Sequence, residues 1–358
     1  MGARSIALLL LALSAGPIGS QVLHPIPTGT LISVTMHSSA LEHNLLGDPA
    51  DQRVDIYLPP GYDPKSNRRY PVIYFLHGLL GQPDDFTKPT FQGMTVEGAL
   101  DTLIAAGKVK PVIAVVPNGR NRYGGSYYAN SSVDGNWEDY IVRDLVTYID
   151  SHYRTLPSAK SRGLAGHSMG GFGALRIAMK HPDVFGAVYA ISPCCVGIPT
   201  ELPPSNPVWA TVRSMDSVSE IWSLFNQGKI EPLEVVSFTA ALLPNPAAPP
   251  LYVTLPVVGE AGQAHYDSAT YARWIRETPL NMASRYAANL RRLRGIAFDV
   301  GLSDQFVHIP PTTQALSDTL DALRIKHTYE RFDGDHRNRL GARMSSRVLP
   351  FFARTLVF

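Results

Sequence analysis

The Gly-His-Ser-Met-Gly-Gly sequence at residues 166–171 constrains the fold more strongly than any other part of this chain. An apolar run at 162–165 is short enough for a buried strand, and residues 172–179 have the apolar spacing of a helix that packs one face inward. Glycines on both sides of Ser168 let the backbone cross itself without a Cβ clash. The pattern predicts a sharp strand–turn–helix that lifts the Ser168 hydroxyl clear of a sheet, in front of a helix N-terminus.

Strand and helix patterns alternate on both sides of this motif. Residues 31–58 contain two stretches of alternating apolar and polar residues, which predict antiparallel strands, and 70–76 is an apolar run typical of a buried strand. The elements predicted next are a helix at 96–106, a strand at 112–116, a helix at 137–153, and strands at 162–165 and 184–191. Such repeated units favour a mainly parallel sheet with helices on both faces.

The alternation of strand and helix patterns stops after Pro193. We interpret residues 199–289, with short helical patterns and a proline-rich stretch at 243–250, as an insertion over the carboxyl edge of the sheet that shapes a pocket. A second small domain, or a loop with no role in a pocket, is the alternative. The alternation of strands and helices then resumes, with a strand predicted at 295–300, a helix at 312–324, a strand at 328–332 and a helix at 338–355. We predict a single domain at 21–358 with this cap-like insertion.

A serine nucleophile needs a base, and the base needs an acid to orient it. On a parallel sheet with a serine turn of this kind, the acid and then the histidine follow the serine, each after a later strand. Asp304 comes after the strand at 295–300, and His336 comes after the last strand. We therefore predict Ser168, His336 and Asp304 as nucleophile, base and acid, with Asp333 and Asp335 as reserve acids.

Other histidines fit the role of base less well. His308 would need its acid elsewhere, and His327 begins a strand at the wrong edge. His167 adjoins the serine, and we expect its side chain to point away from it.

The oxygen of a tetrahedral intermediate needs hydrogen-bond donors already in place, usually backbone N–H groups. Met169 follows the nucleophile and is the first predicted donor. The second belongs to the loop after the strand at 70–76, where His-Gly-Leu-Leu-Gly stands at 77–81, and we favour Leu79. A plain glycine turn is the alternative for this loop.

The N-terminus has the pattern of a signal peptide at residues 1–20. Arg4 is followed by an apolar core at 6–15 and by small residues, and this core is too short to span a bilayer as a stable helix. We predict a secreted or periplasmic protein without stable membrane insertion. An uncleaved membrane anchor is the alternative.

Charge and cysteine content narrow the function further. The formal net charge of the 358 residues is only +2, which gives no electrostatic reason to expect a nucleic-acid partner. The two cysteines, Cys194 and Cys195, are neighbours, too close for an unstrained disulfide, and we predict small buried hydrophobes. No metal-ligand cluster, phosphate loop or nucleotide motif is found in the sequence, so we predict no metal and no cofactor.

Together these residues resemble the putative esterase family of α/β-hydrolases, which includes feruloyl esterases, esterase D and the mycolyltransferases. The stretches that carry the resemblance lie at 54–62, 70–78, 163–174 and 181–185, and the C-terminal part matches chiefly at Asp304 and His336. The resemblance implies an α/β-hydrolase fold, the triad above, and the amides of Leu79 and Met169 as the oxyanion hole. The long segment 199–289 departs from the family, so the substrate is left open.

Two aromatic residues are predicted to contact substrate. Tyr127 belongs to a glycine- and tyrosine-rich loop at 123–128, suited to stack on a sugar or an aromatic ring, with an ordinary surface loop as the alternative. Trp137 lies at the start of the helix predicted at 137–153, which precedes the strand at 162–165. The stretch around it is similar to the corresponding segment of the family.

Our first functional hypothesis is a secreted serine esterase that hydrolyses a small-molecule or carbohydrate ester through an acyl-enzyme. The first alternative is an acyltransferase, similar to the mycolyltransferases, in which a sugar hydroxyl replaces water. The second is a binding protein that kept the fold without turnover. The sequence leaves the oligomeric state open.

Overall fold

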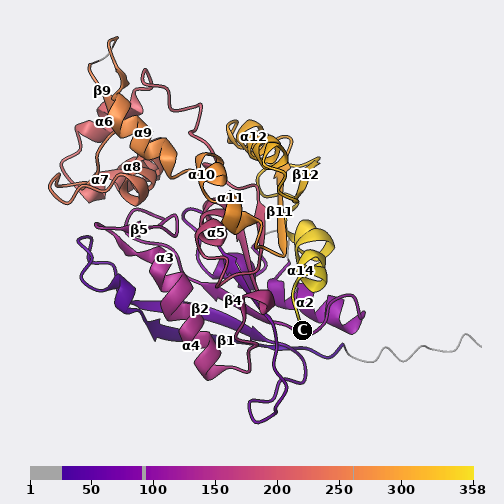
Figure 1. Ribbon diagram of the computed structural model, residues 1–358. Helices are drawn as coiled ribbons and strands as arrows, with labels where there is room; N and C mark the ends of the chain where they lie inside the picture. The colour runs from indigo at the N-terminus through magenta and orange to yellow at the C-terminus, as the bar shows by residue number, and fades with distance from the viewer. Residues whose placement is uncertain (1–25, 91–93, 261) are drawn as a thin grey trace, which may run out of the picture.

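The computed structural model describes residues 26–90, 94–260 and 262–358, so the predicted signal peptide lies outside the described residues. Within these ranges the centre of the molecule is a sheet with strand order β1-β2-β4-β3-β7-β8-β11-β12 (Figure 1). Its strands are β1 (Thr30–His37), β2 (Asp51–Leu58), β3 (Val72–Leu76), β4 (Ile113–Pro117), β7 (Arg162–His167), β8 (Ala187–Ile191), β11 (Gly295–Gly301) and β12 (Thr328–Phe332).

The direction of the strands agrees with the sequence pattern. β2 pairs antiparallel with both β1 and β4, and every later pair of neighbours in the sheet is parallel. The carboxyl ends of β3, β7, β8, β11 and β12 therefore meet at one edge. This is the edge where loops can bring together residues that lie far apart in the chain.

Alternate residues of the strands enter two separate hydrophobic clusters. In β3 the side chains of Val72, Tyr74 and Leu76 join one cluster, while Ile73 and Phe75 join the other. The period of two explains why a continuous apolar run forms a strand here, since both faces are buried. α5 and α12 pack on the first face, whereas α2 and the C-terminal helices cover the second.

The helices outside the segment 199–289 alternate with the strands of the sheet. They are α1 (Asp84–Thr87), α2 (Val96–Ala105), α3 (Trp137–Asp139), α4 (Val146–His152), α5 (Met169–Lys180), α12 (Ile309–Ala322), α13 (Leu340–Arg343) and α14 (Leu349–Thr355). π-helical turns at Tyr140–Leu145 and Met344–Val348 join α3 to α4 and α13 to α14. The single helices expected at 137–153 and 338–355 therefore form with a π turn inside each.

The segment 199–289 is largely helical, and Figure 1 shows α6 to α9 grouped together at one end of the molecule. Its elements are α6 (Val208–Arg213), α7 (Val218–Asn226), α8 (Glu231–Leu242), β9 (Val257–Val258), β10 (His265–Tyr266), α9 (Ser268–Arg276), α10 (Pro279–Arg285) and α11 (Ala287–Leu290). We call residues 199–289 the cap. Ten side chains of α8 are buried, where the helix packs against α6, α7 and the core.

The loop at 118–125 ties the cap to the rest of the molecule. The Tyr123 hydroxyl donates to the carbonyl of Leu251 at 2.6 Å, and the indole N–H of Trp222 donates to the carbonyl of Arg122 at 2.9 Å. We call residues 118–125 the bridging loop. The cap is thus held by directed hydrogen bonds as well as by packing.

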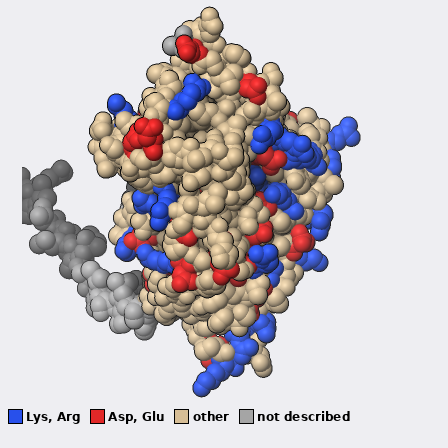
Figure 2. Space-filling model, turned by 90° about the vertical axis from the view of Figure 1, so that its left-hand side faces the viewer, with Lys and Arg blue, Asp and Glu red and all other residues tan. Residues whose placement is uncertain are grey.

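The surface of the molecule has no single-sign charge concentration on the face seen in Figure 2, where basic and acidic side chains are interspersed with uncharged ones. This distribution agrees with the small net charge of +2. Among the helices in the described ranges, none has the length and apolar character needed to cross a membrane.

A buried ion pair links β11 to the C-terminal helices. The Asp299 carboxylate accepts from Arg343 Nε at 2.5 Å and from the Tyr189 hydroxyl at 2.7 Å. Arg343 also binds Glu330, and this second carboxylate is shared with the half-exposed Arg347. Asp299 therefore has a structural role within the sheet.

We expect Arg343→Met to lower the free energy of unfolding by about 3–5 kcal/mol, because it leaves the Asp299 carboxylate buried without its cation. Urea unfolding followed by circular dichroism measures the change. Arg347→Met is the matched control, since the Arg347 side chain is 49% exposed and such pairs contribute about 0–1 kcal/mol. Equal losses in the two variants would contradict the assignment.

Candidate active site

Ser168 stands on a strained turn between β7 and α5. Its φ of +55° and ψ of −120° lie in a region that non-glycine residues rarely adopt. A Cβ at Gly166 would come within 2.1 Å of the Gly170 carbonyl oxygen, and a Cβ at Gly170 within 1.9 Å of that of Leu76. The glycines of the motif are thus required by close backbone contacts, as the sequence predicted.

Backbone hydrogen bonds fix this turn in place. The amide of Ser168 donates to the carbonyl of Ile191 at the end of β8. Its carbonyl accepts from the amides of Phe172 and Cys194, at 3.0 and 3.1 Å. The strain is thereby held by the surrounding structure, and the side chain lines a pocket.

His336 and Asp304 meet at the carboxyl edge of the sheet. The imidazole Nδ1 lies 2.7 Å from Asp304 Oδ2, and both side chains are buried. Asp304 Oδ1 accepts from the amide of Phe306 at 3.0 Å, and the Phe306 ring meets the His336 ring edge-on at 4.9 Å. Because the carboxylate is an acceptor, Nδ1 donates to it, and Nε2 is left as the basic nitrogen.

One pocket of about 290 Å³ contains both Ser168 and His336. Apolar side chains on its wall include Leu79, Tyr127, Phe238 and Phe306. The cap supplies much of the remaining wall, with carboxylate or amide side chains at Glu201, Asn206, Glu231 and Glu234. The segment 199–289 thus shapes the pocket, as the sequence pattern indicated.

The side chains of Met169 and Leu79, whose amides are the predicted oxyanion donors, both lie against Gly125. A Cβ at Gly125 would meet the side chains of both Met169 and Leu79, at 2.3 and 2.8 Å, so this glycine lets the two approach. The amide of Leu80 already donates to the carbonyl of Gly124, at 2.8 Å. Of the two adjacent leucines, Leu80 therefore has its amide engaged within the protein, and Met169 begins α5, where the first helix N–H groups lack intrahelical acceptors.

His77 is a positioning residue that the sequence analysis named only as part of the loop. Its Nδ1 donates to the carbonyl of Gly78 at 2.9 Å, and its Nε2 accepts from the amide of Gly119 in the bridging loop at 2.8 Å. Burial lowers the pKa of His77 to about 4, so the ring stays neutral. It fixes the backbone next to Leu79 without taking up a proton. The adjacent His-Gly pair at the end of a buried strand was the available signal.

His167 is not directed away from the site, so that expectation is wrong. Its ring lines the pocket and packs on the ring of His336 at 4.7 Å, while its Nε2 donates to the His336 carbonyl at 2.8 Å. Burial, then the neighbouring His336, holds the pKa of His167 well below its usual value. The His167 ring therefore stays neutral and supports the backbone of His336 through this hydrogen bond.

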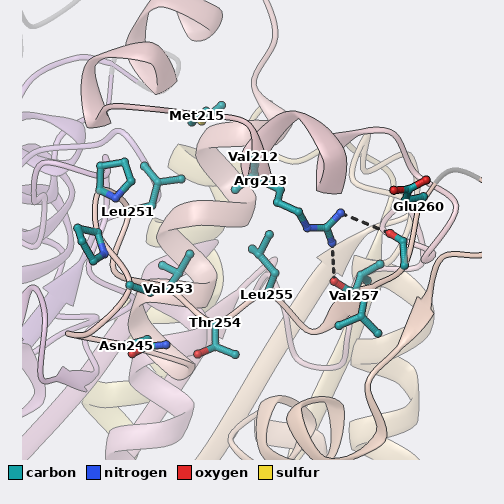
Figure 3. A pocket seen from close by; sticks show the side chains of 15 residues that line it. Val212, Arg213, Met215, Asn245, Leu251, Val253, Thr254, Leu255, Val257 and Glu260 are labelled. Carbon is teal, nitrogen blue, oxygen red and sulfur yellow. Dashed lines mark hydrogen bonds between the residues drawn. The ribbon is translucent and has the colours of Figure 1, made fainter.

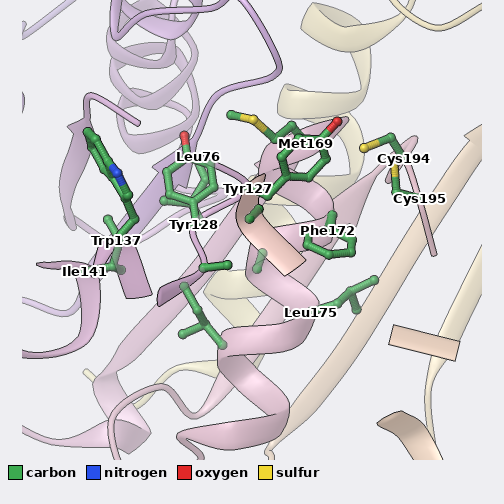
Figure 4. Close-up of a cluster of buried hydrophobic side chains, with 14 of the residues drawn as sticks. Leu76, Tyr127, Tyr128, Trp137, Ile141, Met169, Phe172, Leu175, Cys194 and Cys195 are labelled. Atoms are coloured by element: carbon green, nitrogen blue, oxygen red, sulfur yellow. The ribbon is translucent and has the colours of Figure 1, made fainter. Parts of the chain in front are cut away.

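Of the two predicted substrate contacts, only Tyr127 lines the pocket. Trp137 is fully buried in the core, where its indole N–H donates to the carbonyl of Asp134 and its ring packs edge-on against Tyr140. Figure 4 shows Trp137 and Cys194 at opposite ends of the buried cluster around α5. The prediction for Trp137 is therefore corrected: its nitrogen and its ring are both used in packing.

A larger cavity of about 600 Å³ lies within the cap and is separate from Ser168 (Figure 3). Its wall is mostly apolar, and the Arg213 guanidinium in it is occupied by the carbonyls of Val257 and Gly259. None of the described residues that line it is a serine, cysteine or histidine. Ser168 and His336 line the smaller pocket instead.

The sheet with its serine elbow and its carboxyl-edge pocket defines an α/β-hydrolase. Residues 49–340 match the family model described as "Putative esterase", and the chain belongs to this family.

Two esterases from strains of Mycobacterium tuberculosis are 38% identical to this chain over 138 residues, which is 37% of this chain and 27% of each relative. The chain thus aligns with about a quarter of their length.

Two solved structures share the fold over nearly the whole chain. A ferulic acid esterase has a TM-score of 0.60 at 20% identity, covering 92% of this chain and 99% of its own. A fluorophosphonate-binding serine hydrolase of Staphylococcus aureus has a TM-score of 0.58 at 15% identity, covering 91% and 99%.

Proposed function

We propose that the protein is a serine esterase that hydrolyses carboxylic esters through an acyl-enzyme, with Ser168, His336 and Asp304 as its triad. The observation that carries the proposal is the presence of a strained serine and a carboxylate-bound histidine in one pocket. Strain at a serine and a buried acid–imidazole pair are both costly for folding, and function explains why they coincide. Membership of an esterase family agrees with this chemistry.

In the proposed reaction the Ser168 oxygen attacks the ester carbonyl while His336 Nε2 takes its proton. The carbonyl oxygen becomes an oxyanion, for which the amides of Leu79 and Met169 would be donors, each contributing about 3 kcal/mol. Asp304 stabilises the imidazolium. The bond to the alcohol then breaks, and the leaving alkoxide takes the proton from His336. Water repeats these steps to release the acid.

The pocket wall suggests which half of the ester binds where. Leu79, Tyr127, Phe238 and Phe306 offer apolar surface suited to an acyl group. The carboxylates and amide of the cap offer hydrogen-bond acceptors for hydroxyl groups, which favours a carbohydrate as the alcohol. The same acceptors would hold a sugar as the acyl acceptor, so transfer to a sugar hydroxyl is the second candidate. Export from the cell is part of the proposal and depends on residues 1–20 alone.

A panel of esters with one shared assay tests the proposal. We expect turnover of acetyl esters of sugars with a higher kcat/KM than that of simple alkyl acetates, because the cap carboxylates bind hydroxyl groups. Product analysis in excess glucose or trehalose separates the two candidates: free acid alone supports hydrolysis, and acylated sugar supports transfer. A folded protein that turns over none of these esters would refute both.

A further inference from the structure

A second group of interacting side chains lies on the wall of the same pocket, and the proposed reaction does not use it. It consists of Cys195, His308 and Glu201, with Cys194 beside them, and all four line the pocket together with Ser168. The loop after β8, the loop before α12 and the start of the cap supply these residues. The sequence analysis predicted the cysteines to be buried and unbridged, which they are, but not that they face a pocket.

Glu201 holds the imidazole of His308 in one orientation. A single carboxylate oxygen accepts from His308 Nδ1 at 2.9 Å and from the His308 backbone amide at 3.0 Å, and the other oxygen lies 3.1 Å from Nδ1. Nδ1 is committed to the carboxylate, and Nε2 accepts from the backbone amide of Cys195 at 3.4 Å, so the imidazole lies against the Cys195 loop. An acid and an imidazole beside a cysteine are the groups that activate thiols.

The loop that carries Cys195 is itself constrained. Cys195 has a φ of +54°, which is uncommon for a residue with a Cβ, and only 6% of its surface is exposed. The amide of its neighbour Cys194 donates to the carbonyl of Ser168 at 3.1 Å, so the thiol loop is bonded directly to the serine elbow. A group attached to the Cys195 sulfur would therefore occupy space beside Ser168.

Charges around Cys195 favour the thiolate. Burial alone would raise the pKa of the Cys195 thiol, but hydrogen bonds from Cys194 and His308 outweigh burial and bring it to about 6. Burial would lower the pKa of His308, yet its contacts with Cys195 and Glu201 raise it to about 10. Burial, followed by the neighbouring Cys195, keeps the pKa of Cys194 well above its usual value, so this neighbour remains a thiol.

Two other ionisable groups lie near Cys195: Tyr127, shortly after the bridging loop, and Glu234 in α8. Tyr127 lines the same pocket wall as Cys195 and also lowers the pKa of the Cys195 thiol. Glu234 opposes it: burial, followed by the charges of Cys195 and Glu231, raises the pKa of Glu234 to about 7. Since Glu234 is therefore largely protonated when Cys195 ionises, it does not cancel the effect of the cationic His308.

We propose that Cys195 is a modification site for small disulfides, activated by His308 and Glu201, and that its modification closes the pocket to ester substrates. The Cys195 thiolate attacks one sulfur of the disulfide, a new S–S bond forms, and the other sulfur leaves with the electron pair of the broken bond. The proton that His308 took from Cys195 neutralises the leaving thiolate. A thiol reductant reverses the exchange. The effect on turnover assumes the esterase function proposed above, whereas the modification itself does not.

The test uses dimethyl disulfide, which releases methanethiolate on exchange, on the folded full-length protein, with peptide mass spectrometry to locate the thiomethyl group. We expect selective modification of Cys195, at a rate that rises with a midpoint near pH 6. A free cysteine would have its midpoint at about 8.5. Turnover of p-nitrophenyl acetate should fall at least tenfold in parallel and return after dithiothreitol.

Three variants sharpen this test. Cys195→Ser should keep its own initial activity in the presence of the reagent. His308→Gln should shift the midpoint upward by about one pH unit or more, because the cation next to the sulfur is lost. Glu234→Gln removes the other group that titrates nearby and should leave the midpoint below pH 7.

Three outcomes would overturn the proposal: no modification of Cys195 at pH 7 in folded protein, a midpoint at 8 or above, or complete modification with undiminished turnover. The Ser168→Ala protein separates the two proposals, since its Cys195 should react at the parental rate although it turns over no ester. If the parent proves inactive but Cys195 reacts as described, the esterase proposal fails and the modification site stands.

Discussion

Ser168→Ala is expected to lower kcat for p-nitrophenyl acetate by about a millionfold, because the acyl-enzyme cannot form without the hydroxyl oxygen. The variant should remain folded, since alanine keeps the backbone at the elbow and removes one atom that faces the pocket. Initial-rate kinetics and a thermal unfolding curve measure the two expectations. Labelling with a fluorophosphonate should modify the parent at Ser168 and leave the variant unmodified.

Ser192→Ala is the matched control for this experiment. Ser192 also has a positive φ, of 39°, and it follows the neighbouring strand β8. Its hydroxyl is buried without a hydrogen-bond partner, so its removal should leave both activity and stability nearly unchanged. Undiminished turnover in Ser168→Ala, or an equal loss in Ser192→Ala, would refute the assigned nucleophile.

Asp304→Asn is expected to lower kcat by about ten-thousandfold. The amide is nearly the same size as the carboxylate, but it carries no charge to stabilise the imidazolium and can stabilise the wrong tautomer of His336. KM should change little, because Asp304 lies behind the histidine and does not line the pocket. Steady-state kinetics over a range of ester concentrations separate the two parameters.

Asp333→Asn controls for the loss of a carboxylate near His336. Asp333 is one of the two reserve acids of the sequence analysis. Its side chain is exposed, and its backbone carbonyl accepts from Arg339 Nε. Activity close to that of the parent is expected. If Asp333→Asn were the inactive variant and Asp304→Asn the active one, the acid would have been misassigned.

Local sequence patterns were sufficient to predict the sheet and the position of the serine. Apolar runs that are buried on both faces and glycines that permit close backbone contacts act within a few residues, as at Gly166 and Gly170. The meeting of Asp304 and His336 was also predictable, because parallel strands bring their carboxyl ends to one edge. Chain order and strand direction together supplied that long-range information.

The same reasoning failed where the cap folds back on the core. His308 was set aside for want of an acid, and Glu201, 107 residues earlier in the chain, is that acid. No periodicity connects two loops so far apart. Trp137 was misplaced for a different reason: an aromatic residue near a pocket edge in sequence can turn inward when a carbonyl, here that of Asp134, satisfies its N–H.

The bridging loop has a mechanical consequence for catalysis. It bonds to Leu251 and Trp222 of the cap on one side and to His77 and Leu80 on the other, so it connects the cap to the backbone next to Leu79, the proposed oxyanion donor. An alcohol group that binds well against the cap would, through the bridging loop, favour the alignment of this donor. Recognition of the leaving group and acceleration of its departure would then be a single event, and poorly fitting alcohols would be penalised in rate more than in binding.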